Sequence, residues 1–198
     1  MDESKLFNKY PILETKELSL HKITTRNFND FYEICSNDNL YQYRPCTATK
    51  NQSVVYNMIT MYDRDYNRKK SLTLGIYLKG TLDKLVGIIE VYDFNHSVDM
   101  VTIGYTLNEP YQGQGLATKA LHLLLDYLFF QVNINRVQAY VISENTKSKN
   151  VLFRNNFIQE GTIRQGMQWK GKGVVDLDLF ALLKSDFLKT YYKRNLMA

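Results

Sequence analysis

One segment of the sequence combines glycines and polar side chains at a spacing suited to binding an anion. Gln112-Gly113-Gln114-Gly115-Leu116-Ala117 stands between a predicted strand that ends near Leu107 and a predicted helix that starts by Leu116. Small residues at 113, 115 and 117 let the backbone approach a ligand closely, and the N–H groups at a helix N-terminus favour negative charge. The segment predicts a phosphate or pyrophosphate site, although a tight strand-to-helix turn would use the same glycines.

Two common phosphate loops have a different spacing. A Walker loop needs a lysine and a hydroxyl directly after its last glycine, but Leu116 and Ala117 follow Gly115. A dinucleotide fingerprint needs a third glycine where Thr118 stands, and it follows a parallel strand, whereas the strands predicted before this loop form an antiparallel meander. Neither nucleotide hydrolysis nor a dinucleotide cofactor is favoured.

Three further residues could serve proton transfer or helix capping. Asn145 precedes a short predicted helix and is a natural N-cap, and Ser148 lies three residues later on the same side of the first turn. Glu90 interrupts an apolar run at 85–92, and burial would raise the pKa of its carboxyl group towards a value useful for a general base. A structural pairing of Glu90 with Lys, Arg or Tyr and a water relay without a single base are the alternatives.

The elements that must position these residues follow from the apolar periodicity. Strands are predicted at 13–23, 72–78, 85–92, 100–107, 136–142, 157–168 and 174–183, with helices at 27–36, 54–67, 116–130 and 145–155 and turns at 80–83 and 171–173. The run at 85–92 is apolar on both faces, which predicts a central strand in a sheet covered on both sides. We predict one α/β domain over residues 1–198, in which an antiparallel meander feeds a β–α–β unit.

Composition limits the class of protein. The 198 residues are 44% hydrophobic and carry a net charge of +5, which allows one packed core and a mild preference for anions without the basic face of a dedicated nucleic-acid binder. No direct nucleic-acid binding is therefore expected. Two cysteines and three scattered histidines provide neither a disulfide framework nor metal-ligand spacing, so no metal is expected. The absence of a signal peptide and of a membrane-length apolar stretch predicts a cytoplasmic protein that does not enter a membrane.

The loop pattern resembles that of a known family. Gln112 to Ala117 fits [QR]-x-x-G-x-[GA], the pyrophosphate-binding segment of the Gcn5-related N-acetyltransferase (GNAT) family. Further matches, spread over about residues 13–187, resemble its ribosomal-protein N-terminal (alanine/serine) acetyltransferase branch. They are Ile103-Gly104-Tyr105, Glu144-Asn145-x-x-Ser148, Asn156-Phe157, Asp176 and Leu182-Leu183-Lys184-Ser185-Asp186.

The resemblance implies an α/β (α+β) fold with a mixed, mostly antiparallel central sheet, helices on both faces and a splayed strand pair. It implies that acetyl-CoA, as cosubstrate, lies where the strand at 100–107 diverges from that at 136–142. The pantetheine arm would run beside Thr106 and Leu107, with the pyrophosphate on the loop amides. The implied coenzyme-binding residues are Thr106, Leu107, Gln112, Gly113, Gln114, Gly115, Leu116, Ala117 and Asn145.

The resemblance also suggests catalytic roles. In the family, the serine matched by Ser148, or a tyrosine elsewhere, can protonate the leaving thiolate, and we expect Ser148 to be the general acid. Many relatives place a glutamate just before the Ile-Gly-Tyr tripeptide, but this sequence has Thr102 there, so that role cannot be carried over. We therefore expect Glu90 to be the general base. The stretches 40–44 and 165–169 match regions that flank the acceptor, and the basic side chains of the helix at 145–155 are expected on a solvated face. They are Lys147, Lys149 and Arg154.

The expected function is direct acetyl transfer from acetyl-CoA to a primary amine, with a protein or peptide α-amino group as first candidate. A polyamine, an amino acid or an aminoglycoside is an alternative acceptor. A non-catalytic acetyl-CoA sensor is an alternative of another class, because the same fold can host it. A homodimer is compatible with the sequence.

Overall fold

The computed structural model describes residues 1–80, 84–169, 171 and 173–196, with side chains up to residue 193. The helices are α1 (Glu3–Phe7), α2 (Phe28–Ser36), α3 (Gln52–Asn67), α4 (Leu116–Asp126), α5 (Thr146–Arg154) and α6 (Lys184–Leu196). The strands are β1 (Leu13–Glu14), β2 (Leu18–His21), β3 (Ser71–Leu78), β4 (Lys84–Asn95), β5 (Met100–Leu107), β6 (Arg136–Ile142), β7 (Ile158–Trp169) and β8 (Gly173–Leu183). Short 3-10 turns lie at Thr25–Asn27, Asp38–Tyr41 and Glu109–Tyr111.

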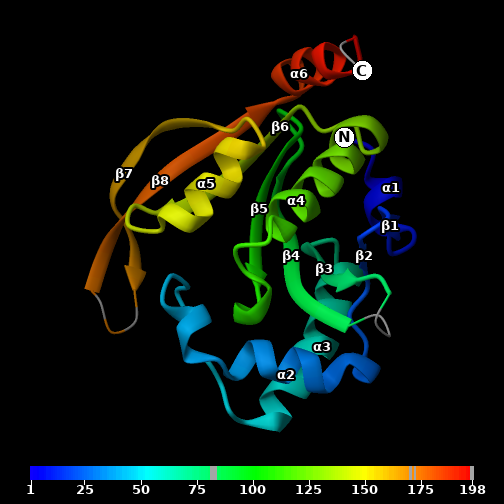
Figure 1. The fold of residues 1–198 in the computed structure, drawn as a ribbon. Helices are drawn as coiled ribbons and strands as arrows, with labels where there is room; N and C mark the ends of the chain where they lie inside the picture. The colour runs from blue at the N-terminus through cyan, green and yellow to red at the C-terminus, as the bar shows by residue number, and fades with distance from the viewer. Residues whose placement is uncertain (81–83, 170, 172, 197–198) are drawn as a thin grey trace.

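The strands form one mixed sheet in the order β1-β2-β3-β4-β5-β6-β8-β7. Every neighbouring pair is antiparallel except β5 and β6, which pair in parallel only from Met100↔Arg136 to Thr102↔Gln138. Beyond Thr102, β5 stays paired with β4 and β6 stays paired with β8, so the two strands diverge. Figure 1 shows the β7–β8 hairpin extending away from β3 and β4. The sheet thus opens into a V at its centre.

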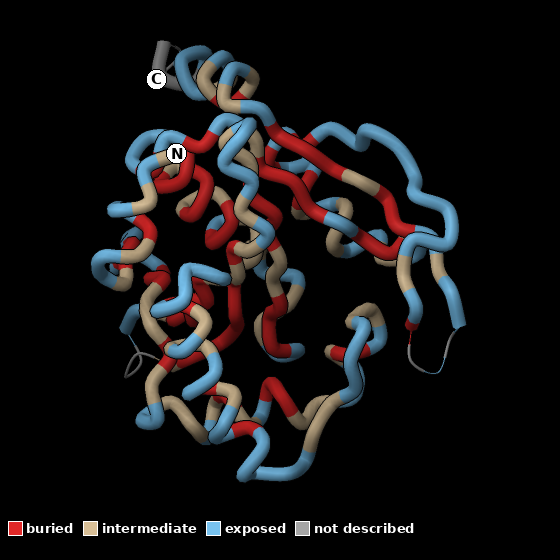
Figure 2. The backbone as a smooth tube through the Cα atoms, turned by 180° about the vertical axis from the view of Figure 1, so that it is seen from behind, coloured by how far each residue is buried: buried red, intermediate tan, exposed pale blue. Residues whose placement is uncertain are grey.

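Both faces of the sheet are covered by helices. Apolar residues of α4 and α5 pack on one face in the larger core cluster, and those of α2 and α3 pack on the other face in a second cluster. Strand β4 contributes side chains to both core clusters. Ile89 and Val91 belong to the larger cluster, and Leu85 and Ile88 belong to the second. Figure 2 shows the buried backbone concentrated in the sheet and the helix surfaces that meet it. The prediction of a central strand buried on both faces is confirmed.

Several predicted boundaries differ from the structure. The single strand predicted at 13–23 is a tight hairpin, in which Leu13 of β1 pairs with Leu20 of β2. The helix predicted at 116–130 ends as an α-helix at Asp126 and continues as a π-helical turn over Tyr127–Gln131. Sequence reasoning also missed α1 and α6, which are short or weakly amphipathic. The predicted turns at 80–83 and 171–173 include residues 81–83 and 172, which lie outside the described residues.

A buried ion pair fixes α5 against β8. Lys149 Nζ lies 2.5 Å from Asp178 Oδ2, and the same carboxylate accepts hydrogen bonds from Ser143 Oγ and Thr162 Oγ1. Burial raises the pKa of Asp178, but the hydrogen bonds from these three partners outweigh it and leave the pKa below its ordinary value. The prediction of a solvated Lys149 was wrong, because the long aliphatic stem of the side chain carries the ammonium to a carboxylate on the neighbouring strand.

None of the described helices is both long and apolar enough to cross a bilayer.

We predict that Asp178→Asn lowers the free energy of unfolding by about 2 kcal/mol at neutral pH, because it leaves the Lys149 charge without its partner. Since the folded-state pKa is depressed, the contribution of the carboxylate is present above the ordinary value of 3.8 and is lost as the pH falls through the folded value. Urea unfolding of the unmutated protein and of Asp178→Asn, at about pH 7 and about pH 3, measures the difference in the free energy of unfolding. Asp186→Asn, which removes an exposed pair with Lys189, should change stability by less than about 0.5 kcal/mol. An equal loss for Asp178→Asn at both pH values would contradict the account.

Candidate active site

The glycine loop adopts a conformation that its two glycines make accessible. Gly113 and Gly115 both have φ of +77°, and Gly115 is the N-cap of α4. A Cβ atom at either position would meet nothing within 4 Å, so the glycines are required by the backbone angle and not by crowding. No side-chain cap hydrogen bond is formed at α4, so the amides of its first turn keep the positive end of the helix dipole without a side-chain acceptor. Such an uncapped helix N-terminus suits an anionic group.

The polar side chains of the loop turn back to support it. Gln112 Nε2 donates to the carbonyl oxygen of Leu107 at 3.0 Å, and Gln114 Nε2 donates to that of Pro110 at 2.9 Å. Lys147 Nζ, on α5, reaches Gln112 Oε1 at 3.5 Å. Among the predicted coenzyme-binding side chains, Gln112 and Gln114 therefore hold the loop in shape. The other predicted residues contribute their backbone and their packing to the loop. Thr106, Leu107 and Leu116 are buried, and Ala117 is half-buried.

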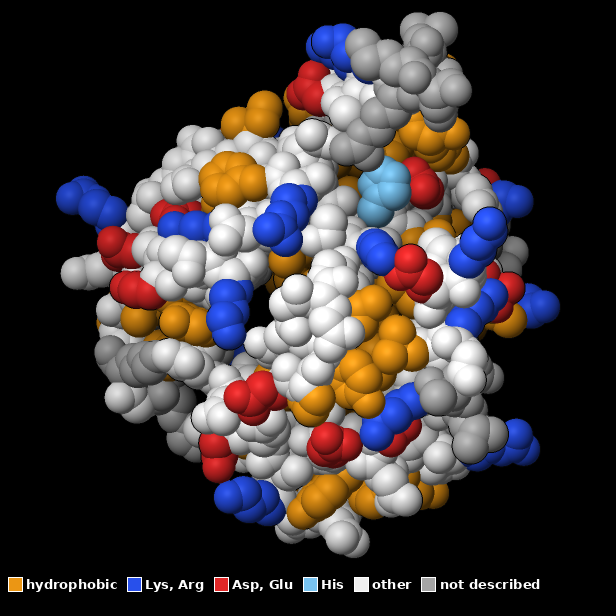
Figure 3. Space-filling model, viewed as in Figure 1, with side chains coloured by type: hydrophobic (Ala, Val, Ile, Leu, Met, Phe, Trp, Pro, Cys, Tyr) orange, Lys and Arg blue, Asp and Glu red, His pale blue; other side chains and the backbone are white. Residues whose placement is uncertain are grey.

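A cavity of about 570 Å³ lies where β5 and β6 diverge. Ile103, Gly104 and Tyr105 of β5 form one side, and Ala139 to Ile142 of β6 form the other. Figure 3 shows the surface hollowed between the part that carries α5 and the part that carries the loop between β5 and α4. Glu90, Asn145 and Ser148 also line the cavity, so the structure brings these three predicted residues together.

Asn145 and Ser148 occupy the start of α5 as the sequence predicts. Asn145 Oδ1 accepts a hydrogen bond from Ser148 N at 3.1 Å, so Asn145 is the N-cap of the helix. Ser148 Oγ lies 3.0 Å from the hydroxyl of Tyr105, which also donates to the Ser148 carbonyl oxygen. Burial raises the pKa of the Tyr105 phenol, which keeps this hydroxyl protonated near neutral pH. Two neighbouring hydroxyl groups at the cavity wall can thus donate a proton.

Glu90 reaches the same cavity from β4 and is paired with Arg44. Arg44 Nη2 lies 3.3 Å from Glu90 Oε2, and each side chain is about one quarter exposed, at 26% and 25%. Burial raises the pKa of Glu90, whereas the Arg44 charge opposes that rise. The Arg44 guanidinium lies over the ring of Tyr41 at 5.5 Å, in the segment that follows α2. A cation from a loop therefore partly offsets the effect of burial on the pKa of this carboxyl group at the cavity wall.

Two residues of the site were only partly anticipated. Arg44 lies in the stretch 40–44 assigned to the acceptor side, but the sequence alone did not pair it with Glu90. Tyr105 stands in the Ile-Gly-Tyr tripeptide, and its contact with Ser148 joins positions 43 residues apart, which no local pattern reports. Thr102 is fully buried and accepts from Gln138 Nε2, so it closes the apex of the V.

Among the residues that the structure describes, no three His, Cys, Asp or Glu side chains gather closely enough to hold a metal ion.

The sequence and the fold are similar to those of known acetyltransferases. Residues 17–158 match the acetyltransferase (GNAT) domain, so the chain belongs to the GNAT family of acetyltransferases. The chain is 29% identical to the N-acetyltransferase p20 of Bacillus licheniformis, called uncharacterized, over 88% of this chain and 97% of that protein. The ribosomal-protein-serine acetyltransferase of Escherichia coli is 24% identical over 84% of this chain and 93% of its own length. These relatives identify the chain as an acetyltransferase.

A solved structure shows the same fold. The microcin C7 self-immunity acetyltransferase MccE, determined in complex with acetyl-CoA and AMP, superposes with a TM-score of 0.77 at 23% identity over 85% of this chain and 93% of that one. At this identity the likeness establishes the architecture, which confirms the predicted mixed sheet with a splayed strand pair.

We predict that Gly115→Ala lowers stability by about 1 to 2 kcal/mol, because a Cβ is strained at a φ of +77°. Gly161→Ala is the matched control, since its Cβ would also meet nothing within 4 Å and its backbone is extended within β7. Thermal and urea unfolding of both variants measure the difference. Equal stability of the two variants would show that the loop backbone differs from the one described.

Proposed function

We propose that this acetyltransferase transfers the acetyl group of acetyl-CoA directly to the α-amino group of a protein or peptide. The cavity at the divergence of β5 and β6 carries this proposal, because Ser148, Tyr105 and Glu90 line it together. The glycine loop connects β5 to α4 in the chain and lies outside the residues that line this cavity. Support for a protein acceptor comes from the E. coli relative named as a ribosomal-protein-serine acetyltransferase, which this chain matches over most of both lengths.

The coenzyme fits the open loop and the divergence of the strands. The amides of Gly113 to Ala117 would receive the pyrophosphate at the N-terminus of α4, where the helix dipole favours negative charge. The backbone of Thr106 and Leu107 would lie beside the pantetheine arm, since β5 has no strand partner on its β6 side beyond Thr102. Acetyl-CoA supplies an acyl group activated as a thioester. Asn145 contributes by fixing the first turn of α5 beside this path.

Three proton transfers complete the reaction. Glu90 accepts the proton that the acceptor ammonium must lose before its nitrogen can attack, directly or through one water. As the C–N bond forms and the C–S bond of the thioester breaks, the Ser148 hydroxyl donates a proton to the departing sulfur. The second proton that the attacking nitrogen loses restores the Ser148 hydroxyl, directly or through water, and Tyr105 holds Ser148 in place by the hydrogen bond between their hydroxyls. Arg44 favours the ionised form of Glu90, because its charge opposes the rise in the Glu90 pKa that burial causes.

Ser148→Ala should lower kcat about 10²-fold while leaving the affinity for acetyl-CoA within about twofold, because the hydroxyl acts on the leaving group and not on the bound coenzyme. Release of free thiol with a peptide acceptor measures kcat, and calorimetry measures affinity. Tyr105→Phe is the companion variant, since it keeps the ring and the Ser148 hydroxyl. Full activity of Ser148→Ala together with a large loss of activity in Tyr105→Phe would identify Tyr105, and not Ser148, as the proton donor.

Glu90→Gln should lower kcat/KM about 10²-fold, because the amide cannot accept the proton of the amine. The active form is the carboxylate, so activity falls as the pH decreases through the pKa of Glu90. Arg44→Met removes the charge that lowers this pKa and should therefore move the acid limb of the kcat/KM profile to higher pH.

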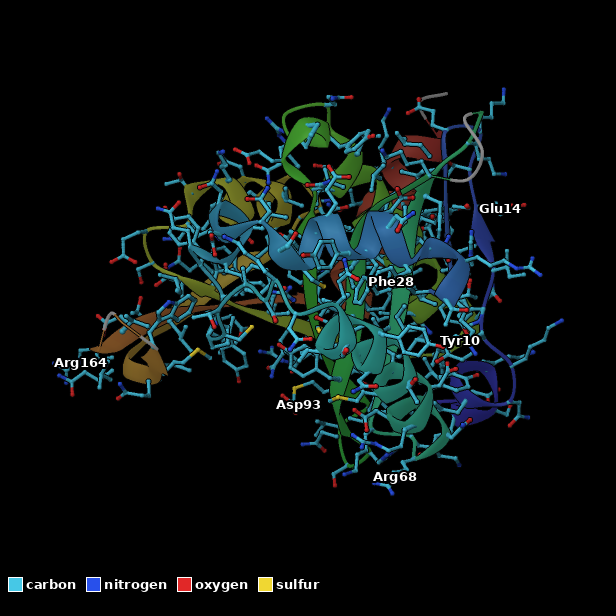
Figure 4. All side chains as sticks on the ribbon, turned by 90° about the horizontal axis from the view of Figure 1, so that it is seen from below. Tyr10, Glu14, Phe28, Arg68, Asp93 and Arg164 are labelled. Atoms are coloured by element: carbon cyan, nitrogen blue, oxygen red, sulfur yellow. The ribbon has the colours of Figure 1, made fainter. Side chains whose placement is uncertain are left out.

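Glu14→Gln is the control for the lost charge, because Glu14 is exposed on β1 and Figure 4 shows it at the far side of the molecule from Arg164 of β7. A Glu90→Gln enzyme as active as Glu14→Gln would exclude Glu90 as the base and favour a water relay.

A further inference from the structure

Strand β7 contains a bulge that residues at and opposite the bulge stabilise. Between the pairs Ile163↔Leu177 and Met167↔Val175, residues 164–166 of β7 face only Asp176 of β8. Gln165 has a φ of +51°, and its amide donates to Asp176 Oδ1 at 2.7 Å. A Cβ at position 166 would lie 2.9 Å from Ile163 Cγ2, so this position requires glycine. Bulges of this kind bend a strand and redirect its side chains beside functional sites.

The bulge leaves Ile163 and Met167 on the same face, and both line the cavity. Arg164, within the bulge, lies at the outer margin of the molecule in Figure 4. Tyr140 of β6 extends the apolar wall, and Trp169 of β7, which is 4% exposed, belongs to the buried cluster against which Met167 packs. Ile163 and Tyr140 are 42% and 38% exposed although they border a concave space, so this wall presents apolar surface that no described residue covers.

Charge in the cavity is sparse. Its described lining carries three charged side chains, Arg44, Glu90 and Asp93, and the first two pair with each other. A polyamine needs several carboxylates along its length. The described lining has two carboxylates, of which Glu90 is paired with Arg44, so an apolar wall beside them does not match a polyamine. It matches one ammonium group with a large apolar substituent next to it.

We propose that the wall formed by Ile163, Met167 and Tyr140 is a subsite for a large apolar side chain on the carbon that bears the acceptor amine. The preferred acceptors are then peptide N-termini that begin with leucine, methionine or phenylalanine. This inference rests on the proposed function and adds the class of acceptor. Methionine suits such a wall, because its flexible thioether adapts to side chains of different shape.

A set of peptides that differ only in their first residue tests the subsite, with free-thiol release as the assay. Leucine, methionine and phenylalanine peptides should have a kcat/KM at least about tenfold above alanine and serine peptides, with spermidine below them. Ile163→Asp should remove this preference while the affinity for acetyl-CoA stays within about twofold. Ile158→Asp is the matched control, because Ile158 is a 60% exposed isoleucine on the same strand that does not line the cavity.

Fluorescence gives a readout that does not depend on turnover. Trp169 is the one tryptophan in the sequence and lines the cavity, so leucinamide should change its emission at concentrations about tenfold lower than alaninamide does. Ile163→Asp should weaken the leucinamide response, and Ile158→Asp should not.

The outcomes separate the two proposals. Equal turnover of all peptides, a preference for alanine or serine peptides, or equal behaviour of Ile163→Asp and Ile158→Asp would overturn the subsite and leave the proposed function standing. A preference for spermidine over all peptides would overturn the subsite and the proposed peptide acceptor together. No acetylation of any amine by a protein that binds acetyl-CoA would overturn the proposed function, and the subsite with it.

Discussion

The early end of pairing between β5 and β6 is the constraint on which the rest of the structure depends. Three parallel pairs hold the strands together at Met100 to Thr102, and beyond them each strand keeps only its outer partner. The backbone on the inner edge of β5 then needs other hydrogen-bonding partners, because buried N–H and C=O groups are costly when unpaired. The side chain of Gln112 provides one such partner by donating a hydrogen bond to the carbonyl oxygen of Leu107. The remaining edge can receive an extended amide-containing ligand in the manner of an added strand.

The elements around the opening keep it from closing. Helix α5 is held to β8 by Lys149 and Asp178, which fixes the Asn145 cap and the Ser148 hydroxyl on one side. The α4 loop is fixed by its own glutamines, and Asn108 donates to Glu33 of α2. Arg44 links the segment after α2 to β4 through Glu90. These contacts hold the elements around the opening in place, and such preorganisation favours catalysis.

The sequence predicted what local patterns encode. The glycine spacing at 113 and 115 located the loop, the apolar run at 85–92 identified the central strand, and Asn145 was correctly expected as a helix cap. Contacts between distant positions were not accessible. The pairing of Lys149 with Asp178, of Arg44 with Glu90 and of Tyr105 with Ser148 depends on which strands become neighbours. The bulge at 164–166 depends on the register between β7 and β8, which the residue pattern of one strand alone does not reveal.

The proposed function requires that the glycine loop and the opening between β5 and β6 bind acetyl-CoA. Calorimetric titration of acetyl-CoA into Gly115→Glu, compared with Gly161→Glu, tests this binding site most directly. Both variants add one negative charge at a glycine whose surroundings are open, but only the first places it in the loop at the N-terminus of α4. We predict that binding is lost in Gly115→Glu and kept in Gly161→Glu. Unchanged affinity in Gly115→Glu would contradict the proposed coenzyme site.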